Sequence, residues 1–509
     1  MQALPERLSA PLRRLRRPSV IAGAVWTSAY VAVWSTGERF DTSYLGFAWQ
    51  LIPAEILRAD PIRSTWYLHI QPPLWNLAIG SILRWSPFPD AISLQAMMFV
   101  FGVLLVGMLA SIVHRLTSRP MLAVVVAVVA TMHPDVLGNA FVPNYELATA
   151  TMLVAFVWLA TSSRRDGWWF AGLASIATAT AMTRSLYHPV WVVLVLVIVA
   201  WSVRDRISWR TVVVGAAIPV LVIGGWMVKN EVMFGHATLS SWFGMNLQRA
   251  VIPVLPADEL QALHERGEVS SIALVGPFGN YDLYKPYVPP CTPRHQVPAT
   301  DTPVRAGEVV VPNFNYECFL PVFDQAGADA WAAIKDSPRS FVSGRLWSAR
   351  TWFAINSGSA GSPSFVMRSL DKLGKVAGVE VPGVISTRGW GTPIYGVLDA
   401  PANFALTLVA LSLLVLAFAV RCTARTLRRR RDEPPATRDL AFVLVGLIVL
   451  WTFVTGITFE LGEQARFRTM IDPLVITFGA IAVVELLRVI RGRRRRDGVE
   501  DVADEVVAG

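Results

Sequence analysis

The chain has 509 residues, of which 53% are hydrophobic and 16% are charged. A soluble domain carries roughly a quarter charged residues, so this composition excludes an ordinary soluble protein and indicates an integral membrane protein. The formal net charge is +9, but the arginines gather in short clusters between apolar segments, which argues against a nucleic-acid partner.

Ten apolar segments approach the length of about 20 residues that a membrane-spanning helix needs. The sequence therefore predicts an all-α integral membrane protein, built as a bundle of about ten transmembrane helices. The predicted spans lie near residues 19–36, 92–114, 120–137, 146–162, 168–184, 188–203, 210–228, 402–420, 440–457 and 471–490.

Basic clusters occupy every second connection if the ten spans alternate in direction. This positive-inside pattern predicts a multi-pass protein of the plasma (inner) membrane with both termini cytoplasmic. Residues 1–18 would be a basic cytoplasmic N-terminus and residues 491–509 a cytoplasmic tail. The basic residues at both termini are also suited to binding the anionic head groups of membrane lipids. Arginine clusters occur at 13–17, 164–165, 204–210, 425–431 and 491–496.

The first predicted span is followed by an unusual loop, residues 37–90, which we predict to be extracytoplasmic and catalytic. It contains the acidic residues Glu38, Asp41 and Asp60, and it continues through His69 and Gln71 to two prolines. Charged groups at a membrane boundary are costly to keep and suggest a functional site. The alternative is an ordinary interfacial loop whose acidic residues face water.

Isolated charges follow the later spans on the same predicted side of the membrane. Arg184 lies between the fifth and sixth spans, where a side chain that snorkels to the interface is a serious alternative to a ligand-binding role. The remaining charges of this kind are Lys229, Arg249, Glu463, Arg466 and Arg468.

Residues 231–400 are rich in proline and glycine and contain no convincing span. We predict an extracytoplasmic, membrane-proximal domain there, between a transmembrane core over 19–230 and C-terminal transmembrane helices over 401–490. Two amphipathic helical pieces are predicted within 327–354, separated at Pro338. Cys291 and Cys318 share this compartment, which permits a disulfide between them; two free thiols are the alternative.

The polar groups gather at one side of the predicted membrane, which favours an enzyme at the outer surface. A transporter usually places such groups near the bilayer midplane. The chain lacks the motifs of serine hydrolases, zinc proteases and nucleotide-binding loops, and its histidines and cysteines show no zinc-ligand spacing. A carboxylate can take a proton from a hydroxyl nucleophile, and guanidinium groups match phosphate oxygens. The combination fits sugar transfer from a membrane-anchored phosphate donor.

Four stretches resemble the polytopic GT-C glycosyltransferases, in particular the branch of protein O-mannosyltransferases and lipid A aminoarabinose transferases. The likeness covers roughly residues 20–250 and 440–490. The sequence departs from the family where an acidic pair becomes Asp41-Thr42, and where Gln71 is inserted into a His-Pro-Pro-Leu element. The four stretches are Arg39-Phe40-Asp41, His69-Ile70-Gln71-Pro72-Pro73-Leu74, the segment from Lys229-Asn230 to Asn246-Leu247, and Glu463-Gln464-Ala465-Arg466-Phe467-Arg468 with Asp472-Pro473-Leu474.

The resemblance implies a GT-C fold, a polyprenyl-phosphate sugar donor and an inverting transfer on the extracytoplasmic side. Asp41 is then the expected general base and Asp60 the second choice, with Glu38 also open. The residues expected to bind the donor phosphate are Arg184, Arg249, Arg466, Arg468 and Lys229. The residues expected to orient the loop or the donor are Glu38, His69, Gln71 and Glu463, although His69 fits a helix-end cap equally well.

Several alternatives stay open at this point. The acceptor could be an envelope polysaccharide, a lipid or a protein. No cofactor is certain, and dependence on a divalent metal stays undecided because the sequence shows no dedicated cage and no metal-ligand set. The competing functions are a lipid or polysaccharide transporter, and a non-catalytic membrane scaffold that keeps the fold.

Overall fold

The structure, a computed structural model, describes residues 17–305, 311–354, 362–378, 380–385, 400–428 and 436–507. Most of the predicted basic N-terminus therefore lies outside the described residues, as do residues 429–431 of the arginine cluster after the eighth predicted span. The described part is helical apart from one antiparallel pair of strands, β1 (Glu380–Ile385) and β2 (Ala400–Ala405). The predicted all-helical class is confirmed, with this small sheet as the exception.

The first predicted loop is filled by short helices. Prolines begin two of the helices in this region, α2 and α5, where the missing proline N–H costs no intrahelical hydrogen bond. The elements are α2 (Pro18–Ser35), α3 (Tyr44–Phe47), α4 (Ala54–Ala59), α5 (Pro61–Trp66), α6 (Leu74–Trp85) and α7 (Asp90–Thr117).

Two of the following spans are interrupted at prolines. The axis bends by 67° between α8 and the short helices that begin at Pro134, and a π-helical turn follows Pro219 within a continuous 26-residue span. The elements are α8 (Pro120–Thr131), α9 (Pro134–Gly138), η1 (Asn139–Phe141), α10 (Tyr145–Ala160), α11 (Gly167–Thr183), α12 (Pro189–Ser202), α13 (Trp209–Pro219), η2 (Val220–Gly224) and α14 (Gly225–Phe234).

The predicted helix pair around Pro338 is confirmed, since α19 ends at Asp336 and α20 begins at Pro338. The segment also contains α15, which crosses α19 so closely that a Cβ on Gly244 would lie 1.9 Å from the Phe323 carbonyl oxygen. The elements are α15 (Phe243–Val251), η3 (Ile252–Val254), α16 (Ala257–Glu265), α17 (Ser271–Val275), α18 (Tyr281–Tyr284), η4 (Lys285–Tyr287), η5 (Glu317–Phe319), α19 (Leu320–Asp336), α20 (Pro338–Trp352) and α21 (Phe365–Gly378).

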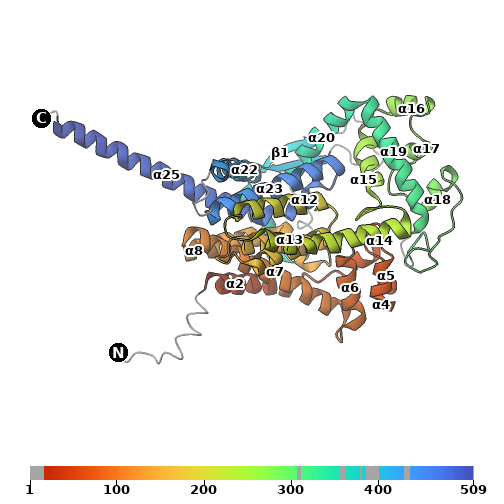
Figure 1. Ribbon diagram of the computed structural model, residues 1–509, viewed down its shortest axis with the longest axis horizontal. Coiled ribbons are helices and arrows are strands. Elements are labelled where there is room, and N and C mark those ends of the chain that lie inside the picture. Colours follow the sequence, from red (N-terminus) through yellow and green to blue (C-terminus); the bar gives the residue numbers. More distant parts are fainter. Residues whose placement is uncertain are drawn as a thin grey trace.

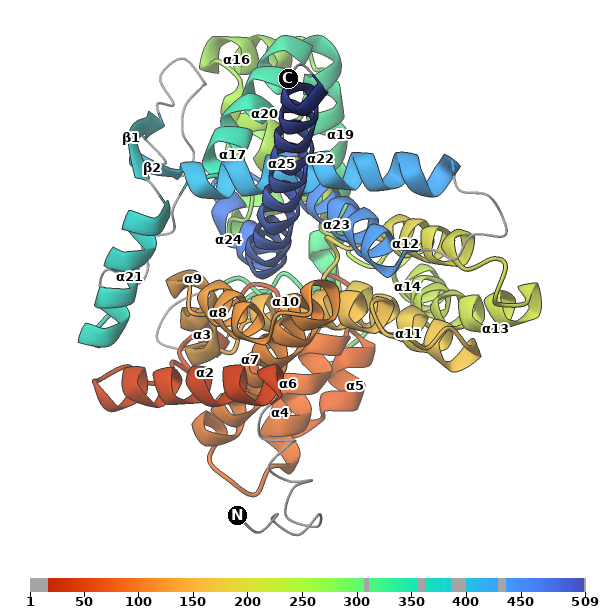
Figure 2. The same cartoon turned by 90° about the vertical axis from the view of Figure 1, so that its left-hand side faces the viewer.

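The C-terminal part adds α22 (Leu406–Arg428), α23 (Thr437–Phe459), α24 (Gln464–Thr469) and α25 (Asp472–Val507). Figure 1 shows α16 to α20 gathered at the right-hand end, while α25 extends from the left-hand end. In Figure 2, α22 and α23 cross above the N-terminal helices α2 to α7. Contacts of α23 with α10 and of α25 with α8 join the two ends of the chain, so loops distant in sequence can meet.

Each of the ten predicted spans overlaps a helix or a run of adjoining helices, although the eighth, 402–420, begins within β2 and not in α22. Among the described residues, five helices are long and apolar enough to cross a membrane, or six if the bent pair at α8 and α9 is one span. The other predicted spans correspond to α2, α10, α11 and α12, which are shorter or less apolar. The count of ten therefore stays a prediction.

Candidate active site

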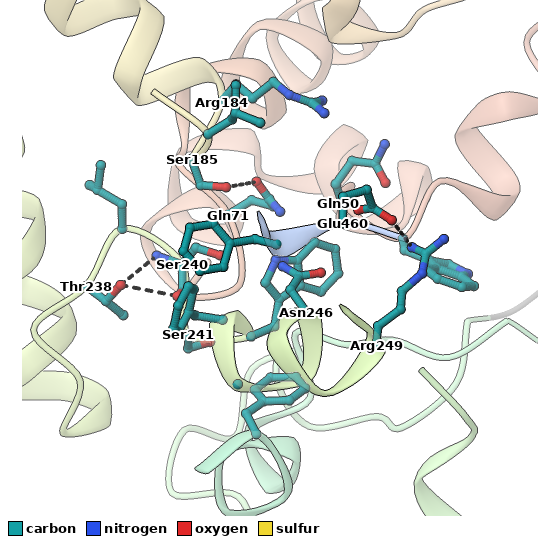
Figure 3. Close-up of a pocket in the computed structure, with 18 of the residues that line it drawn as sticks. Gln50, Gln71, Arg184, Ser185, Thr238, Ser240, Ser241, Asn246, Arg249 and Glu460 are labelled. Atoms are coloured by element: carbon teal, nitrogen blue, oxygen red, sulfur yellow. Dashed lines mark hydrogen bonds and ion pairs between the residues drawn. The ribbon is translucent and has the colours of Figure 1, made fainter. Parts of the chain in front are cut away.

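A cavity of about 1020 Å³ lies where these distant elements meet. Its walls come from the first loop, from the ends of α10, α11, α23 and α24, and from α15 and α19. Figure 3 shows side chains that point into it from several of these elements. Five of the residues predicted from the sequence line this cavity: Gln71, Arg184, Arg249, Glu463 and Arg466.

Glu146 joins two of these arginines at the start of α10. Arg184 Nη1 donates to Glu146 Oε1 at 3.2 Å, and Arg466 Nε lies 3.0 Å from the same oxygen. The Glu146 side chain is only 1% exposed. A buried carboxylate is stable when positive groups surround it, so the two guanidinium groups are fixed by their common acidic partner.

The third arginine, Arg249 on α15, pairs with acids at the end of α23. Its Nη1 lies 3.1 Å from Glu460 Oε1 and 3.8 Å from Glu463 Oε2. Arg466 Nη1 donates to Glu463 Oε1 at 3.0 Å. Glu463 therefore links the Arg249 pair to the Arg466 pair, and one network contains three guanidinium groups and three carboxylates.

The two acids after α23 differ in their electrostatic surroundings. Burial raises the pKa of Glu460, against the opposing charge of Arg249. Burial also raises the pKa of Glu463, but the charges of Arg466, Arg249 and Arg184 outweigh it, so that pKa lies below its ordinary value. Glu463 is thus held ionised, whereas Glu460 is shifted toward its neutral form.

Aromatic and neutral polar groups complete this part of the wall. The Arg184 guanidinium lies 4.2 Å from the ring centre of Tyr145 and 4.4 Å from that of Phe467, a cation–π arrangement on both rings. Ser185 Oγ donates to Gln71 Oε1 at 3.4 Å, and the cavity also receives Gln50 and Asn246 (Figure 3). Such hydroxyl and amide groups are suited to hydrogen bonds with a polar ligand.

The three acids considered as the general base lie outside the residues that line the cavity. Asp41 is exposed and accepts a hydrogen bond from the Ser43 backbone N–H at 2.9 Å; it lies three residues before α3, whose Tyr44 lines the cavity. Asp60 caps α5 by accepting the Arg63 backbone N–H. Glu38 accepts a hydrogen bond from Ser362 Oγ. Of the three, Asp41 is closest in sequence to a residue that lines the cavity, Tyr44, and the choice of base stays a prediction.

His69 is fully buried and holds the first loop against two other segments. Its backbone N–H donates to Asn315 Oδ1, its Nδ1 lies 2.7 Å from Ser241 Oγ, and its Nε2 lies 3.0 Å from the Asn315 carbonyl oxygen. The carbonyl requires a proton on Nε2, so Nδ1 accepts from the serine. Burial lowers the pKa of His69 to about 3. His69 is therefore a neutral residue outside the cavity lining, which holds the first loop in place through hydrogen bonds.

Lys229 and Arg468, both expected to bind phosphate, instead bind backbone carbonyl groups outside the cavity lining. Lys229 Nζ donates to the carbonyl oxygens of Trp66 and Leu68 at 2.9 and 3.0 Å. Arg468 donates through Nε to Asp472 and through Nη1 to the carbonyl oxygens of Trp352 and Ala354. These contacts tie separate chain segments together.

Cys291 and Cys318 form a disulfide, with their Cα atoms 5.7 Å apart. The bridge joins the loop before α19 to the 3₁₀ turn that leads into that helix. Within the described residues, no group of three or more His, Cys, Asp or Glu side chains is arranged to hold a metal ion.

Sequence reasoning missed Glu146 and Glu460, the two acids that anchor the arginines. A signal was present, because each is a carboxylate at the end of a long apolar segment, where burial without a cationic partner is costly. The sequence did not show which arginines these acids contact, because Glu146 pairs with arginines from two later parts of the chain.

Comparisons with known proteins find similarity to solved structures at low sequence identity and low TM-score. No protein-family model matches the chain, and no curated protein matches it. The chain is similar to ArnT from Cupriavidus metallidurans bound to undecaprenyl phosphate, with 13% identity and a TM-score of 0.32 over 91% of this chain and 76% of ArnT.

The chain is also similar to the Archaeoglobus fulgidus oligosaccharyltransferase, whose apo form gives 10% identity and a TM-score of 0.41 over 95% of this chain. The same archaeal protein, AglB, in complex with an inhibitory peptide and a dolichol-phosphate gives a TM-score of 0.38. This chain spans 51% of that protein's length. At these identities and TM-scores the similarity assigns no role to any residue here.

Proposed function

We propose that the chain is a membrane glycosyltransferase of the GT-C type, which moves a sugar from a polyprenyl-phosphate donor to an envelope acceptor with inversion. The observation that carries this proposal is the convergence of Arg184, Arg249 and Arg466 on one cavity at the ends of apolar helices. A lipid-linked phosphate needs an apolar environment for its lipid chain and guanidinium groups for its phosphate oxygens. A cavity with arginines at the ends of apolar helices offers both.

The arginine network supports a role for the cavity in stabilising a departing phosphate. Each guanidinium is fixed in place by a carboxylate, so its remaining N–H groups are preorganised before a ligand arrives. Negative charge that develops on the leaving phosphate is then stabilised without large rearrangement.

In the proposed reaction Asp41 takes the proton from an acceptor hydroxyl. The freed oxygen attacks the anomeric carbon of the donor sugar, the bond from that carbon to the phosphate oxygen breaks, and polyprenyl phosphate leaves toward the arginines. Asp41 is exposed beside α3, and its backbone N–H donates to the Phe141 carbonyl oxygen at 2.8 Å, which ties it to the turn before α10. This position suits a base at the edge of the cavity.

The proposed orientation places the cavity on the extracytoplasmic side of the plasma membrane and both termini in the cytoplasm. Residues 231–400 then form the extracytoplasmic domain, and the predicted arginine clusters at the opposite loop ends support this orientation. The Cys291–Cys318 disulfide fits the same assignment, because disulfides persist in oxidising compartments.

The test is turnover by the purified full-length protein with a panel of polyprenyl-phosphate sugars, followed as release of polyprenyl phosphate. Wild type and Asp41→Asn are compared with Asp258→Asn, which removes an exposed acid on α16, as the matched control. Turnover of one donor that is lost only in Asp41→Asn supports both the reaction and the base. Parallel assays with EDTA and with added Mg²⁺ or Mn²⁺ decide metal dependence.

Other outcomes separate the alternatives. Turnover that survives Asp41→Asn keeps the reaction and moves the base to Asp60 or Glu38. Donor binding without turnover, combined with movement of the donor across a vesicle membrane, favours a transporter. Neither binding nor turnover with any donor and acceptor pair favours the non-catalytic scaffold.

A further inference from the structure

One wall of the cavity is formed by α19 and takes no part in the arginine network. Asp324, Gly327, Ala328 and Trp331 all line the cavity from this helix. Their spacing places them on one helix face, with about 10 Å of axial rise between the first and the last. Trp331 is 50% exposed, so its indole is accessible rather than packed in the core.

Asp324 is fixed in position by His236, which follows α14. His236 Nε2 lies 2.9 Å from Asp324 Oδ1, and His236 Nδ1 lies 2.8 Å from the Phe234 carbonyl oxygen. Carboxylate and carbonyl oxygens both accept hydrogen bonds, so this arrangement favours the ring with a proton on each nitrogen. The hydrogen bond to Asp324 accordingly raises the pKa of His236.

The Asp324 carboxylate remains accessible in this arrangement, since its side chain is 63% exposed. An ionised carboxylate has more acceptor sites than one imidazolium uses, so it can accept hydrogen bonds from ligand hydroxyls. Gly327 and Ala328 lie between Asp324 and Trp331 in the sequence of this wall. Gly327 packs against the Gly244 backbone of α15, and Ala328 adds only a methyl group beside the carboxylate and the indole.

We infer that this α19 wall binds a carbohydrate, and that the acceptor of the transfer is therefore a glycan. A sugar ring has an apolar face of C–H groups that packs on an indole, and a rim of hydroxyls that donate to a carboxylate. The wall offers both groups on one helix. The identification of this carbohydrate as the acceptor rests on the proposed function. The binding of a carbohydrate to the α19 wall does not depend on that function.

The same wall is poorly suited to the other two acceptor classes. A phosphorylated lipid acceptor would bring its negative charge next to Asp324, which is unfavourable. A peptide in extended form commonly pairs with a sheet edge, whereas α15 and α19 are helices whose backbone groups are hydrogen-bonded internally.

The test uses the full-length protein in detergent and measures binding of two ligands separately. The first is a set of neutral, end-labelled oligosaccharides of mannose, arabinose, glucose and galactose; the second is undecaprenyl phosphate. Variants are Trp331→Ala, Trp331→Phe and Asp324→Asn. Trp85→Ala, which removes an exposed indole outside the cavity lining, is the matched control.

We expect at least one oligosaccharide to bind wild type and to lose about tenfold or more in affinity with Trp331→Ala. Trp331→Phe keeps a ring and should recover part of that loss, and Asp324→Asn should weaken binding without affecting undecaprenyl phosphate. Trp85→Ala should bind like wild type. A Trp331→Ala protein that still binds undecaprenyl phosphate is folded, so its loss of glycan binding is local.

The two proposals fail in different ways. If undecaprenyl phosphate binds and none of the oligosaccharides does, or if Trp331→Ala binds them unchanged, the glycan site is wrong and the donor site stands. If a peptide library binds in a Trp331-dependent way instead, the acceptor is a protein and the inference is overturned. If oligosaccharides bind and no polyprenyl phosphate does, the wall is a carbohydrate site and the proposed transfer reaction is wrong.

Discussion

Glu146, in the first turn of α10, lies 3.0 Å from Nε of Arg466 in α24. The same carboxylate also accepts a hydrogen bond from Arg184, so a single acid compensates one buried cation and one that is partly exposed. We expect Glu146→Gln to lower the free energy of unfolding by about 3 kcal/mol, because it leaves the buried Arg184 without its counter-charge, whereas Arg466 keeps Glu463. Thermal unfolding of the detergent-solubilised protein measures this loss.

The matched control is Glu463→Gln, which removes a less buried acid of the same network. Its effect on unfolding should be clearly smaller, because solvent screens a partly exposed ion pair. Equal losses for the two variants would contradict the assignment of Glu146 as the central acid.

Arg249 and Arg468 should respond differently to replacement, although both were predicted to bind phosphate. Arg249→Gln should weaken undecaprenyl-phosphate binding by about tenfold or more, since Arg249 lines the cavity. Arg468→Gln should instead lower stability by about 3–5 kcal/mol, because Arg468 is 2% exposed and bonded to Asp472. Lipid-binding isotherms and thermal unfolding on both variants separate the roles. A binding defect in Arg468→Gln at unchanged stability would contradict them.

The local geometry of α24 explains why sequence could not separate Arg466 from Arg468. Residues two apart on a helix lie about 200° around its axis, so only one of the two faces the cavity. Which one does so depends on how α24 sits between α10 and α20, a tertiary fact. The positions of the apolar segments, in contrast, follow from local composition, and each predicted span overlaps a helix.

Lys229 shows a second limit of sequence reasoning. A lysine at the end of a span is a fair candidate for an anionic ligand, but its Nζ donates to carbonyl oxygens of the first loop, more than 150 residues earlier. The backbone of that loop has no periodic pattern to reveal unpaired carbonyl groups. His69 differs, because a helix-end or loop-orienting role was among its expected roles, and the contacts with Ser241 and Asn315 are of that structural kind.

His69 also predicts a pH dependence of stability. Its pKa is lowered to about 3 by burial, whereas an unfolded histidine titrates near 6.5. Below about pH 6.5 the unfolded chain gains a proton that the native ring does not, so the free energy of unfolding falls by ~1.4 kcal/mol per pH unit from this residue alone. Above that pH the contribution is fully present. Thermal unfolding between pH 5 and 7.5 measures the slope.

The comparison for this experiment is His69→Gln, which cannot titrate. It should be less stable than wild type at pH 7.5 and should show a weaker decline toward pH 5. An unchanged slope would assign the acid sensitivity to other groups.

The Cys291–Cys318 disulfide closes a loop with a sequence separation of 27 residues. Loop-entropy arguments give a contribution of about 3–4 kcal/mol for a loop of this size. We expect the Cys291→Ala, Cys318→Ala double variant to unfold at a lower temperature than wild type. Dithiothreitol should lower the unfolding temperature of wild type and leave that of the double variant unchanged. The buried Cys422 is present in both proteins and controls for reaction elsewhere.

Gly244 sets the closest approach of α15 to α19. An added Cβ would lie 1.9 Å from the Phe323 carbonyl oxygen and 2.8 Å from the Gly327 backbone nitrogen, and neither backbone atom can move independently. Gly244→Ala should therefore cost about 1–3 kcal/mol of stability through overpacking and displace the α19 wall. Gly46→Ala is the control, because no atom lies within 4 Å of its added Cβ. We expect Gly244→Ala, but not Gly46→Ala, to lower both the unfolding temperature and the affinity for oligosaccharides.

The order in which the chain is synthesised determines when the charges of the arginine network become balanced. As the ribosome delivers the chain, Glu146 and Arg184 arrive first and form a neutral pair, and Arg249 follows as one surplus cation. Glu460, Glu463 and Arg466 emerge last, close together, with one negative charge in excess, which balances Arg249. The site reaches neutrality only when α23 and α24 have been inserted, so a nascent chain truncated before α23 would carry a surplus charge beside the bilayer.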